Sequence, residues 1–248
     1  AKVYSSLSAM CGPDTIPFNN YSLARIGDFY YPDGSLTHDL CKSLNPIGIV
    51  FSLNTSEDER QNGWSHGWII SLFSALDRYG SDIMNWSGGE EYTLGKYYSS
   101  AKKAKEDISG WQSTQEMSKQ PNCFVAANAA KLHLWEIPLN QSSGWYLPSL
   151  GQLNTLMENL GGVKMTKDGD YRNASLNKNC PFFKALFGNI MRIWTSSEIE
   201  KGSPASLNTG FGNGSYYVNT RNNCYYDAYV PSNILKTQGC AVYPVAAF

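Results

Sequence analysis

The residue types most able to do chemistry are few in this sequence and lie far apart. None of the three histidines, His38, His66 and His133, has the spacing of a catalytic pair or a metal site. The neighbouring carboxylates Glu90 and Glu91 would point to opposite faces of a strand, so they could not flank one bond as a glycosidase pair does. We therefore predict no catalytic residues and no enzymatic activity.

The six cysteines do not form a recognisable catalytic or metal-binding motif. They stand at positions 11, 41, 123, 180, 224 and 240, without a Cys-x-x-Cys pair and without a nearby pair of histidines. A structural zinc site normally needs such closely spaced ligands, so we predict none. Buried thiols and disulfide bonds both stay open, because spacing alone does not choose between them.

Composition predicts a globular chain that does not bind nucleic acid. The 248 residues are 42% hydrophobic and only 17% charged, which fits neither a disordered segment nor a coiled coil. The net charge of -1 gives no positive field for a phosphate backbone. Since no apolar run approaches the roughly 20 residues that cross a bilayer, we also expect no membrane span.

The amino-terminal part of the sequence predicts a lead-in followed by short strands. Residues 1–24 show no sustained periodicity and are expected to be an irregular lead-in or linker. A strand at 28–31 runs into a Pro-Asp-Gly-Ser turn at 32–35, which predicts a hairpin. The apolar runs 47–53 and 67–73 predict two buried, paired strands.

The middle of the sequence is helical, and the last third returns to strands. Helical spacing of apolar residues predicts helices over 95–110 and 123–134. A third helix is expected to begin after Ser149, a good N-cap, and to end at Gly161. Further strands are predicted at 190–197, 215–220 and 240–248. Strands at both ends with helices between them indicate the α+β class.

Four segments of the sequence carry a resemblance to a known family. They are residues 48–51 with 66–72, then 145–153, 193–198 and 242–248. In this order they resemble the Lcl-type C-terminal domain and the related Fibrobacter-type major paralogous domain of bacterial surface proteins. The resemblance covers residues 25–248. It implies a C-type-lectin-like fold with paired terminal strands, two or three helices and a long looped ligand region.

The resemblance also has consequences that the structure can test. It implies that residues 241–248 pair with a strand near 28–31. It does not identify a ligand, because Tyr243 stands where the family commonly has arginine and residues 202–213 are longer and richer in Gly and Asn than usual.

Calcium sites of the lectin kind receive little support from the sequence. Residues 120–122 read Gln-Pro-Asn, one of the two triplets that calcium-dependent lectins use, but the second, Trp-Asn-Asp, does not occur. Residues 168–173 offer carboxylate and amide oxygens, yet they lack the final bidentate glutamate of an EF-hand loop. We predict no metal and no cofactor.

The resemblance and the residues together place a ligand face on the loops from Glu198 to Asn233. Around the turn-forming pair at 222–223, tyrosines, amides and charges converge in a predicted hairpin. The predicted ligand-binding residues are Tyr216, Asn219, Arg221, Asn222, Tyr225 and Asp227. An ordinary cross-strand ladder of aromatic rings explains the same pattern, so both interpretations stay open.

These observations lead to three hypotheses about function. The first is an extracellular, non-enzymatic adhesin-like module on the bacterial cell surface, which binds a glycan or a host or surface protein through its C-terminal loops. The alternative is a structural or assembly subunit, such as a tip subunit, of a surface appendage. The third is a ligand-binding protein diversified by a retroelement, since such proteins favour Asn, Tyr, Asp and Ser near the carboxy terminus.

Overall fold

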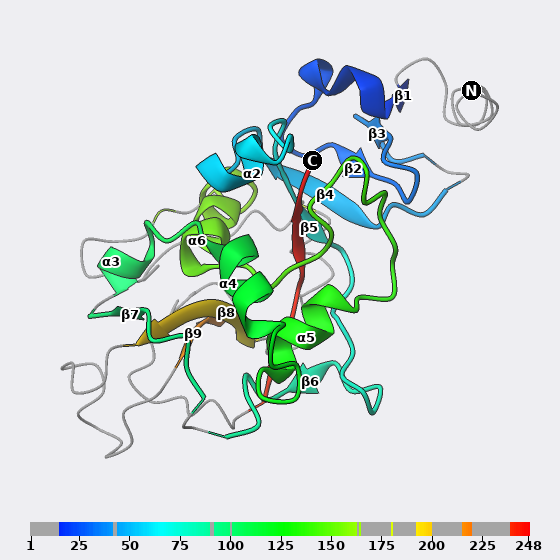
Figure 1. Cartoon of the computed structure of the whole chain (residues 1–248). Helices are drawn as coiled ribbons and strands as arrows, with labels where there is room; N and C mark the ends of the chain where they lie inside the picture. Colours follow the sequence, from blue (N-terminus) through cyan, green and yellow to red (C-terminus); the bar gives the residue numbers. More distant parts are fainter. Residues whose placement is uncertain are drawn as a thin grey trace.

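The chain folds into two β-sheets and a small number of helices (Figure 1). The computed structural model describes residues 15–41, 44–89, 92–99, 101–162, 164, 180, 192–199, 215–219 and 239–248. This mixture of short strands and separate helices agrees with the predicted α+β class.

The first sheet has six strands, and each is antiparallel to its neighbours. In spatial order they are β1 (Thr15–Ile16), β3 (Leu36–Thr37), β2 (Phe29–Tyr30), β4 (Gly48–Ser52), β5 (Trp68–Ser71) and β11 (Val245–Ala247). Strands β4 and β5 lie within the apolar runs that predicted them, every residue of both strands is buried, and the two strands pair as expected. Buried strands read as continuous apolar runs because both of their faces are covered.

The turn between β2 and β3 confirms the predicted hairpin. Gly34 has a φ of 86°, which a residue without a Cβ adopts at little cost, and its N–H donates to the Tyr31 carbonyl at 2.9 Å. Residues before the hairpin also join the sheet, because β1 pairs with β3. Ile16, Tyr21 and Ala24 are buried in the same cluster as strand residues of β2 and β4. The domain boundary between residues 24 and 25 stays a prediction.

The partner of the last strand differs from the one predicted. Strand β11 pairs with β5, with Ala246 opposite Ile69, and not with the strand at 28–31. Strands β4 and β5 lie between β11 and β2 in the sheet, so the two predicted partners share a sheet without touching. The other side of β11 is covered by residues 143–146, where Tyr146 and Val245 exchange backbone hydrogen bonds of 2.9 and 3.0 Å.

The second sheet is built from strands that are far apart in the sequence. In spatial order it contains β6 (Ile83–Met84), β10 (Cys240–Ala241), β8 (Arg192–Ile199) and β7 (Tyr97–Tyr98), and β9 (Ser215–Asn219) also pairs with β8. The predicted strands at 190–197 and 215–220 are thereby confirmed, whereas the single strand predicted over 240–248 is divided into β10 in this sheet and β11 in the first. Two buried indoles fasten the sheet, since Trp194 Nε1 donates to the Met84 carbonyl and Trp86 Nε1 to the Thr195 carbonyl, both at 2.8 Å.

The helices confirm two of the three predicted ones. They are the 3₁₀ helix η1 (Phe18–Leu23), α2 (Glu57–Gln61), α3 (Ala101–Ala104), α4 (Gly110–Met117), α5 (Val125–Lys131) and α6 (Leu150–Asn159). The single helix expected over 95–110 is wrong. Tyr97 and Tyr98 there form β7, which pairs with Glu198 and Ile199 of β8, and only the short α3 follows. Long-range strand pairing has overridden a local helical pattern.

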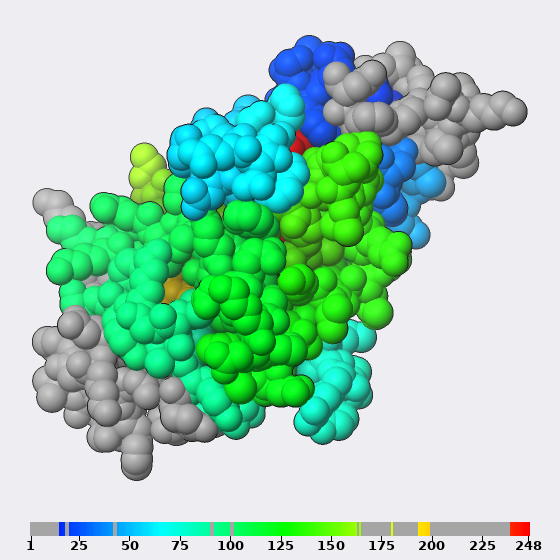
Figure 2. Space-filling model, in the orientation of Figure 1, coloured from blue at the N-terminus to red at the C-terminus, as the bar shows by residue number. Residues whose placement is uncertain are grey.

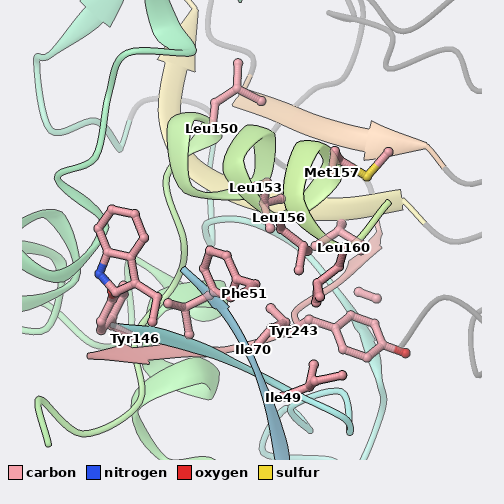
Figure 3. Packing of buried hydrophobic residues seen from close by; sticks show 14 of the residues in the cluster. Ile49, Phe51, Ile70, Tyr146, Leu150, Leu153, Leu156, Met157, Leu160 and Tyr243 are labelled. Atoms are coloured by element: carbon pink, nitrogen blue, oxygen red, sulfur yellow. The ribbon is translucent and has the colours of Figure 1, made fainter. Parts of the chain in front are cut away.

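The main hydrophobic cluster lies between α6 and the sheets. One face of α6 presents Leu150, Leu153, Leu156 and Met157, and Figure 3 shows these side chains above Phe51, Ile49 and Ile70 of β4 and β5. A second cluster surrounds α5, whose small residues Ala126, Ala127, Ala129 and Ala130 are buried against Trp86, Trp194 and Val242. Small side chains let this helix approach the segment after β6 closely, where the Ala126 N–H donates to the Trp86 carbonyl at 3.2 Å.

A buried carboxylate forms hydrogen bonds with several residues of the segments that carry the family resemblance. Glu59 is fully buried and accepts hydrogen bonds from Trp68 Nε1 at 2.8 Å and from the Tyr146 hydroxyl at 2.7 Å. The same hydroxyl accepts from Gln152 Nε2 at 2.7 Å. Glu59 and Gln152 each close a capping box, with Ser56 at the start of α2 and Ser149 at the start of α6. Tyr146 therefore joins two helix starts through one network.

Close backbone packing accounts for the glycine in the first turn of α6. The Gly151 N–H donates to the Asp107 carbonyl at 2.9 Å, and a Cβ at this position would stand 2.3 Å from that oxygen. The Asp107 side chain continues inward, where it accepts from the Ser197 hydroxyl of β8 at 2.6 Å. The segments that carry the resemblance thus meet in the interior and hold the helices on the sheets.

Candidate functional site

Most of the predicted ligand face lies outside the described residues. Tyr216 and Asn219 lie on β9, where Asn219 is opposite Arg192 of β8. Arg221, Asn222, Tyr225 and Asp227 fall outside the described part of the chain, as do the oxygen-rich segment 168–173 and the pair Glu90–Glu91. The predicted ligand-binding residues remain a prediction. Within the described ranges, no group of three or more His, Cys, Asp or Glu is placed to hold a metal ion.

Among the cysteines, the structure shows both of the states that the sequence left open. Cys41 is disulfide-bonded. Cys123, partly exposed at the start of α5, is a free thiol. Each pattern therefore occurs in this chain, and spacing alone could not have shown which cysteine takes which state.

The histidines make contacts that are typical of structural residues. His38 Nδ1 lies 2.7 Å from Asp28 Oδ1. His66 begins the segment before β5, where its backbone N–H donates to the Phe248 carbonyl at 2.8 Å and its ring meets Tyr21 edge-on.

His133 and Ser71 form a pair whose geometry resembles that of a base and a nucleophile. His133 Nε2 lies 2.9 Å from Ser71 Oγ, but Ser71 is fully buried and its hydroxyl donates to the Phe73 carbonyl at 2.8 Å. His133 Nε2 therefore donates to Ser71 Oγ. His133 Nδ1 then carries a lone pair, which is buried and has no hydrogen-bond partner among the described residues. Burial lowers the pKa of His133 to about 4. This arrangement holds the neutral ring in place and offers no accessible nucleophile.

A charged depression lies beside α4, and its groups are engaged with one another. Its volume is about 450 Å³, and it is lined by residues of α2, α3 and the loop before α4. Lys96 Nζ donates to Ser109 Oγ at 2.8 Å and lies 3.5 Å from Asp107 Oδ1. Burial raises the pKa of Tyr98, and the nearby Asp107 carboxylate adds to the effect. These contacts stabilise the junction between α4 and the second sheet.

A second concavity lies between α5 and the segment around β6. We call it the α5 groove and define it by residues 76–80 and 83–85 on one side, Val125, Asn128, Ala129, Leu132 and Leu134 on the other, and residues 88 and 121–122 at one end. Its volume is about 640 Å³. In Figure 2 the turquoise segment that contains residues 76–80 lies at the lower right of the molecule, beside the green helix α5.

The α5 groove lies within a concentration of exposed apolar side chains. Seven of the fourteen exposed large apolar side chains among the described residues belong to residues 73–83 and 132–135. Tyr79 is 79% exposed, Leu132 68% and Leu134 71%. Beside the groove, the rings of Phe73 and Trp135 stack at 4.8 Å between centroids. Monomeric soluble proteins rarely expose contiguous apolar patches, so this surface is the best candidate for contact with a partner.

The polar groups of the α5 groove are mainly uncharged amides. The side chains of Asn85, Asn122 and Asn128 line it and make no hydrogen bond with any described residue. Asp77 is occupied by its own loop, because Oδ1 accepts from the N–H groups of Tyr79 and Ser81 at 2.8 and 2.9 Å. Arg78 makes no ion pair within the described chain, and its guanidinium lies 4.8 Å from the centre of the Tyr79 ring.

Sequence reasoning missed this surface, although one signal of it is visible. Leu132 and Leu134 flank the buried His133, so the residues after α5 alternate between interior and exterior. Leu132 and Leu134 thereby present apolar side chains to solvent at a turn, where the core does not need them. The run was instead included in a helix over 123–134, which made Leu132 and Leu134 look like core residues.

The fold resembles a solved structure of a protein from a surface appendage. The neighbour is a crystal structure of a fimbrial protein from Bacteroides ovatus, with a TM-score of 0.55 and 14% sequence identity. The likeness covers 91% of this chain and 49% of that protein, so the chain spans about half the length of its neighbour. At this identity the likeness concerns the fold alone.

The sequence comparisons give no closer assignment. No protein-family model matches the chain, and no curated protein matches it. In the described part of the chain, none of the helices has the length and apolar character needed to cross a bilayer. The chain is an α+β protein whose fold resembles about half of one fimbrial protein, and it has an exposed apolar groove beside α5.

Proposed function

We propose that the chain is a structural or assembly subunit of a surface appendage and acts outside the bacterial cell. The observation that carries this proposal is the likeness to a fimbrial protein over 91% of the chain. The α5 groove supports it, because a subunit must offer its neighbours a surface that is exposed in the isolated chain. A C-type-lectin-like fold, as the family-like segments suggest, is part of the proposal.

The proposal includes the absence of enzymatic activity. Support comes from the pair formed by Ser71 and His133. The buried Ser71 hydroxyl donates to a backbone carbonyl and does not face a substrate. Assays for hydrolysis and thiol oxidation with the purified chain test this part. Turnover that a single substitution in this chain abolishes would contradict it.

An adhesin that binds a glycan or a surface protein is the second candidate. One observation favours it. Strand β9 pairs with β8 over residues 215–219 and leads directly into the segment that contains Arg221, Asn222, Tyr225 and Asp227. The β8–β9 pair would then support a loop rich in tyrosine and amide groups, which are well suited to polar surfaces.

One experiment separates the two candidates. Appendages are sheared from cells that produce the protein and are probed with antibodies against the purified chain, with a strain that lacks its gene as the control. A structural subunit is expected in the sheared fraction and along labelled filaments, and loss of the gene should shorten or remove the filaments. If the filaments persist without the gene while attachment to surfaces is lost, the adhesin candidate is favoured. A chain confined to the cell interior would contradict both.

A further inference from the structure

We propose that the α5 groove binds an extended apolar peptide segment that carries a single carboxylate. The inference rests on the proposed function for the source of that segment, which is a neighbouring subunit of the appendage. The chemistry of the groove itself is argued from its shape, its amides and its charge.

The apolar side chains of the groove are arranged as two walls. Leu132 and Leu134 follow α5, Leu76 and Ile83 belong to the segment around β6, and all four line the groove. All four are exposed, so a segment lying between them would remove apolar surface on both of its sides from water. The walls are aliphatic, which suits the branched side chains of an extended peptide better than the flat faces of sugar rings.

The backbone of β6 is not free to accept another strand. The Ser81 hydroxyl donates to the Ile83 carbonyl at 2.7 Å and accepts from the Ile83 N–H at 3.2 Å. A serine that satisfies both groups blocks ordinary strand addition at this edge. A bound segment must therefore find its hydrogen bonds elsewhere in the groove.

The three asparagines supply those hydrogen bonds. Asn85, Asn122 and Asn128 each carry two N–H donors and one acceptor oxygen, and none is used within the described chain. The backbone of an extended peptide presents donors and acceptors in alternation, which amides match in both directions. Because these amides carry no charge, they place no unpaired charge against the uncharged backbone of a bound peptide.

The charge of the groove selects one negative group. Asp77 Oδ1 accepts from two N–H groups of its own loop, whereas the Arg78 guanidinium, over the Tyr79 ring, forms no ion pair or hydrogen bond with any described residue. A carboxylate on the bound segment would pair with the Arg78 guanidinium. The guanidinium lies over one face of the Tyr79 ring, so a sugar could stack only on the other face. A peptide is thus favoured over a glycan.

The test uses a displayed library of random heptapeptides, selected on the purified chain. Counter-selection uses the double variant Leu132→Ser/Leu134→Ser, whose substitutions are at exposed positions and should leave the melting temperature unchanged. We expect enrichment of peptides with alternating aliphatic residues and one Asp or Glu. No enrichment over the double variant, or enrichment of strongly charged sequences, would overturn the inference.

The best selected peptide is then synthesised with a fluorescent label, and its Kd is measured by polarisation. Leu132→Ser should weaken binding by about tenfold or more, whereas the matched control Leu23→Ser, exposed outside the groove, should leave it unchanged. Arg78→Gln should weaken binding several-fold at low salt and less at high salt. A Kd that is equal for the wild type and both groove variants would move the peptide site elsewhere.

A glycan array run on the same variants covers the competing ligand class. Binding of a sugar that Leu132→Ser or Arg78→Gln abolishes would replace the peptide by a glycan. Failure of this inference is separable from failure of the proposed function. If the chain is found in filaments but its groove selects no peptide, only the peptide inference fails. If the chain binds such peptides but is absent from filaments, it is not an appendage subunit.

Discussion

Removal of one buried hydroxyl should destabilise the whole fold, because Tyr146 joins the two capping boxes. Tyr146→Phe removes the donor to Glu59 Oε1 and the acceptor for Gln152 Nε2, both at 2.7 Å. A buried hydrogen bond to a charged group contributes about 1.5–3 kcal/mol, and an orphaned buried donor costs about 1–3 kcal/mol. We expect a loss of about 3 kcal/mol in the free energy of unfolding, or roughly 6–12 °C in Tm for a chain of this size.

The measurement is urea unfolding followed by tryptophan fluorescence and by circular dichroism, which must coincide. The control is Tyr79→Phe, which removes a hydroxyl from an exposed ring and should change the free energy by less than about 0.5 kcal/mol. A double-mutant cycle with Glu59→Gln should give a coupling energy of about 1 kcal/mol or more. If Tyr146→Phe were as stable as Tyr79→Phe, the network would not hold α2 and α6 together.

Two further predictions concern pH and close packing. The pKa of His133 is about 4 in the folded chain and about 6.5 in the unfolded chain. Between these pH values the unfolded state binds more protons than the folded state. The free energy of unfolding should therefore fall by up to about 3 kcal/mol as the pH drops from 6.5 to 4. Urea midpoints across this range test it, and His133→Gln should remove most of the slope, whereas His66→Gln, at an exposed position, should not. Gly151→Ala should lower the free energy of unfolding by about 1–3 kcal/mol, because the new Cβ would stand 2.3 Å from the Asp107 carbonyl oxygen. The control Glu158→Ala, on the exposed side of the same helix, should change it little, and thermal melts of both variants test this.

The elements that the sequence predicted well are those whose signals are local. The start of α6 was visible because Ser149 is a good N-cap residue, and in the structure Ser149 and Gln152 close a capping box there. Strands β4 and β5 were visible as buried apolar runs. In each case the residues that determine the element lie within a few positions of it.

The features that the sequence did not predict depend on contacts between distant segments. Tyr97 and Tyr98 lie in a stretch with helical spacing, yet β8, about 100 residues later, pairs with them as a strand. The choice of β5 as the partner of β11 is likewise set by which faces are buried in the final sheet. The α5 groove was invisible because an apolar residue in a sequence does not show whether it faces the core or solvent.

The segment 240–248 affects when the two sheets can form. Its first part is β10 in the second sheet and its last part is β11 in the first, and the red trace in Figure 1 runs through the molecule between them. Their partners were synthesised long before, since β11 pairs with residues 68–70. Neither sheet is complete until these residues have left the ribosome. Both sheets therefore depend on contacts between segments that are far apart in the sequence, and folding should be slow because the long loops between these segments must close first.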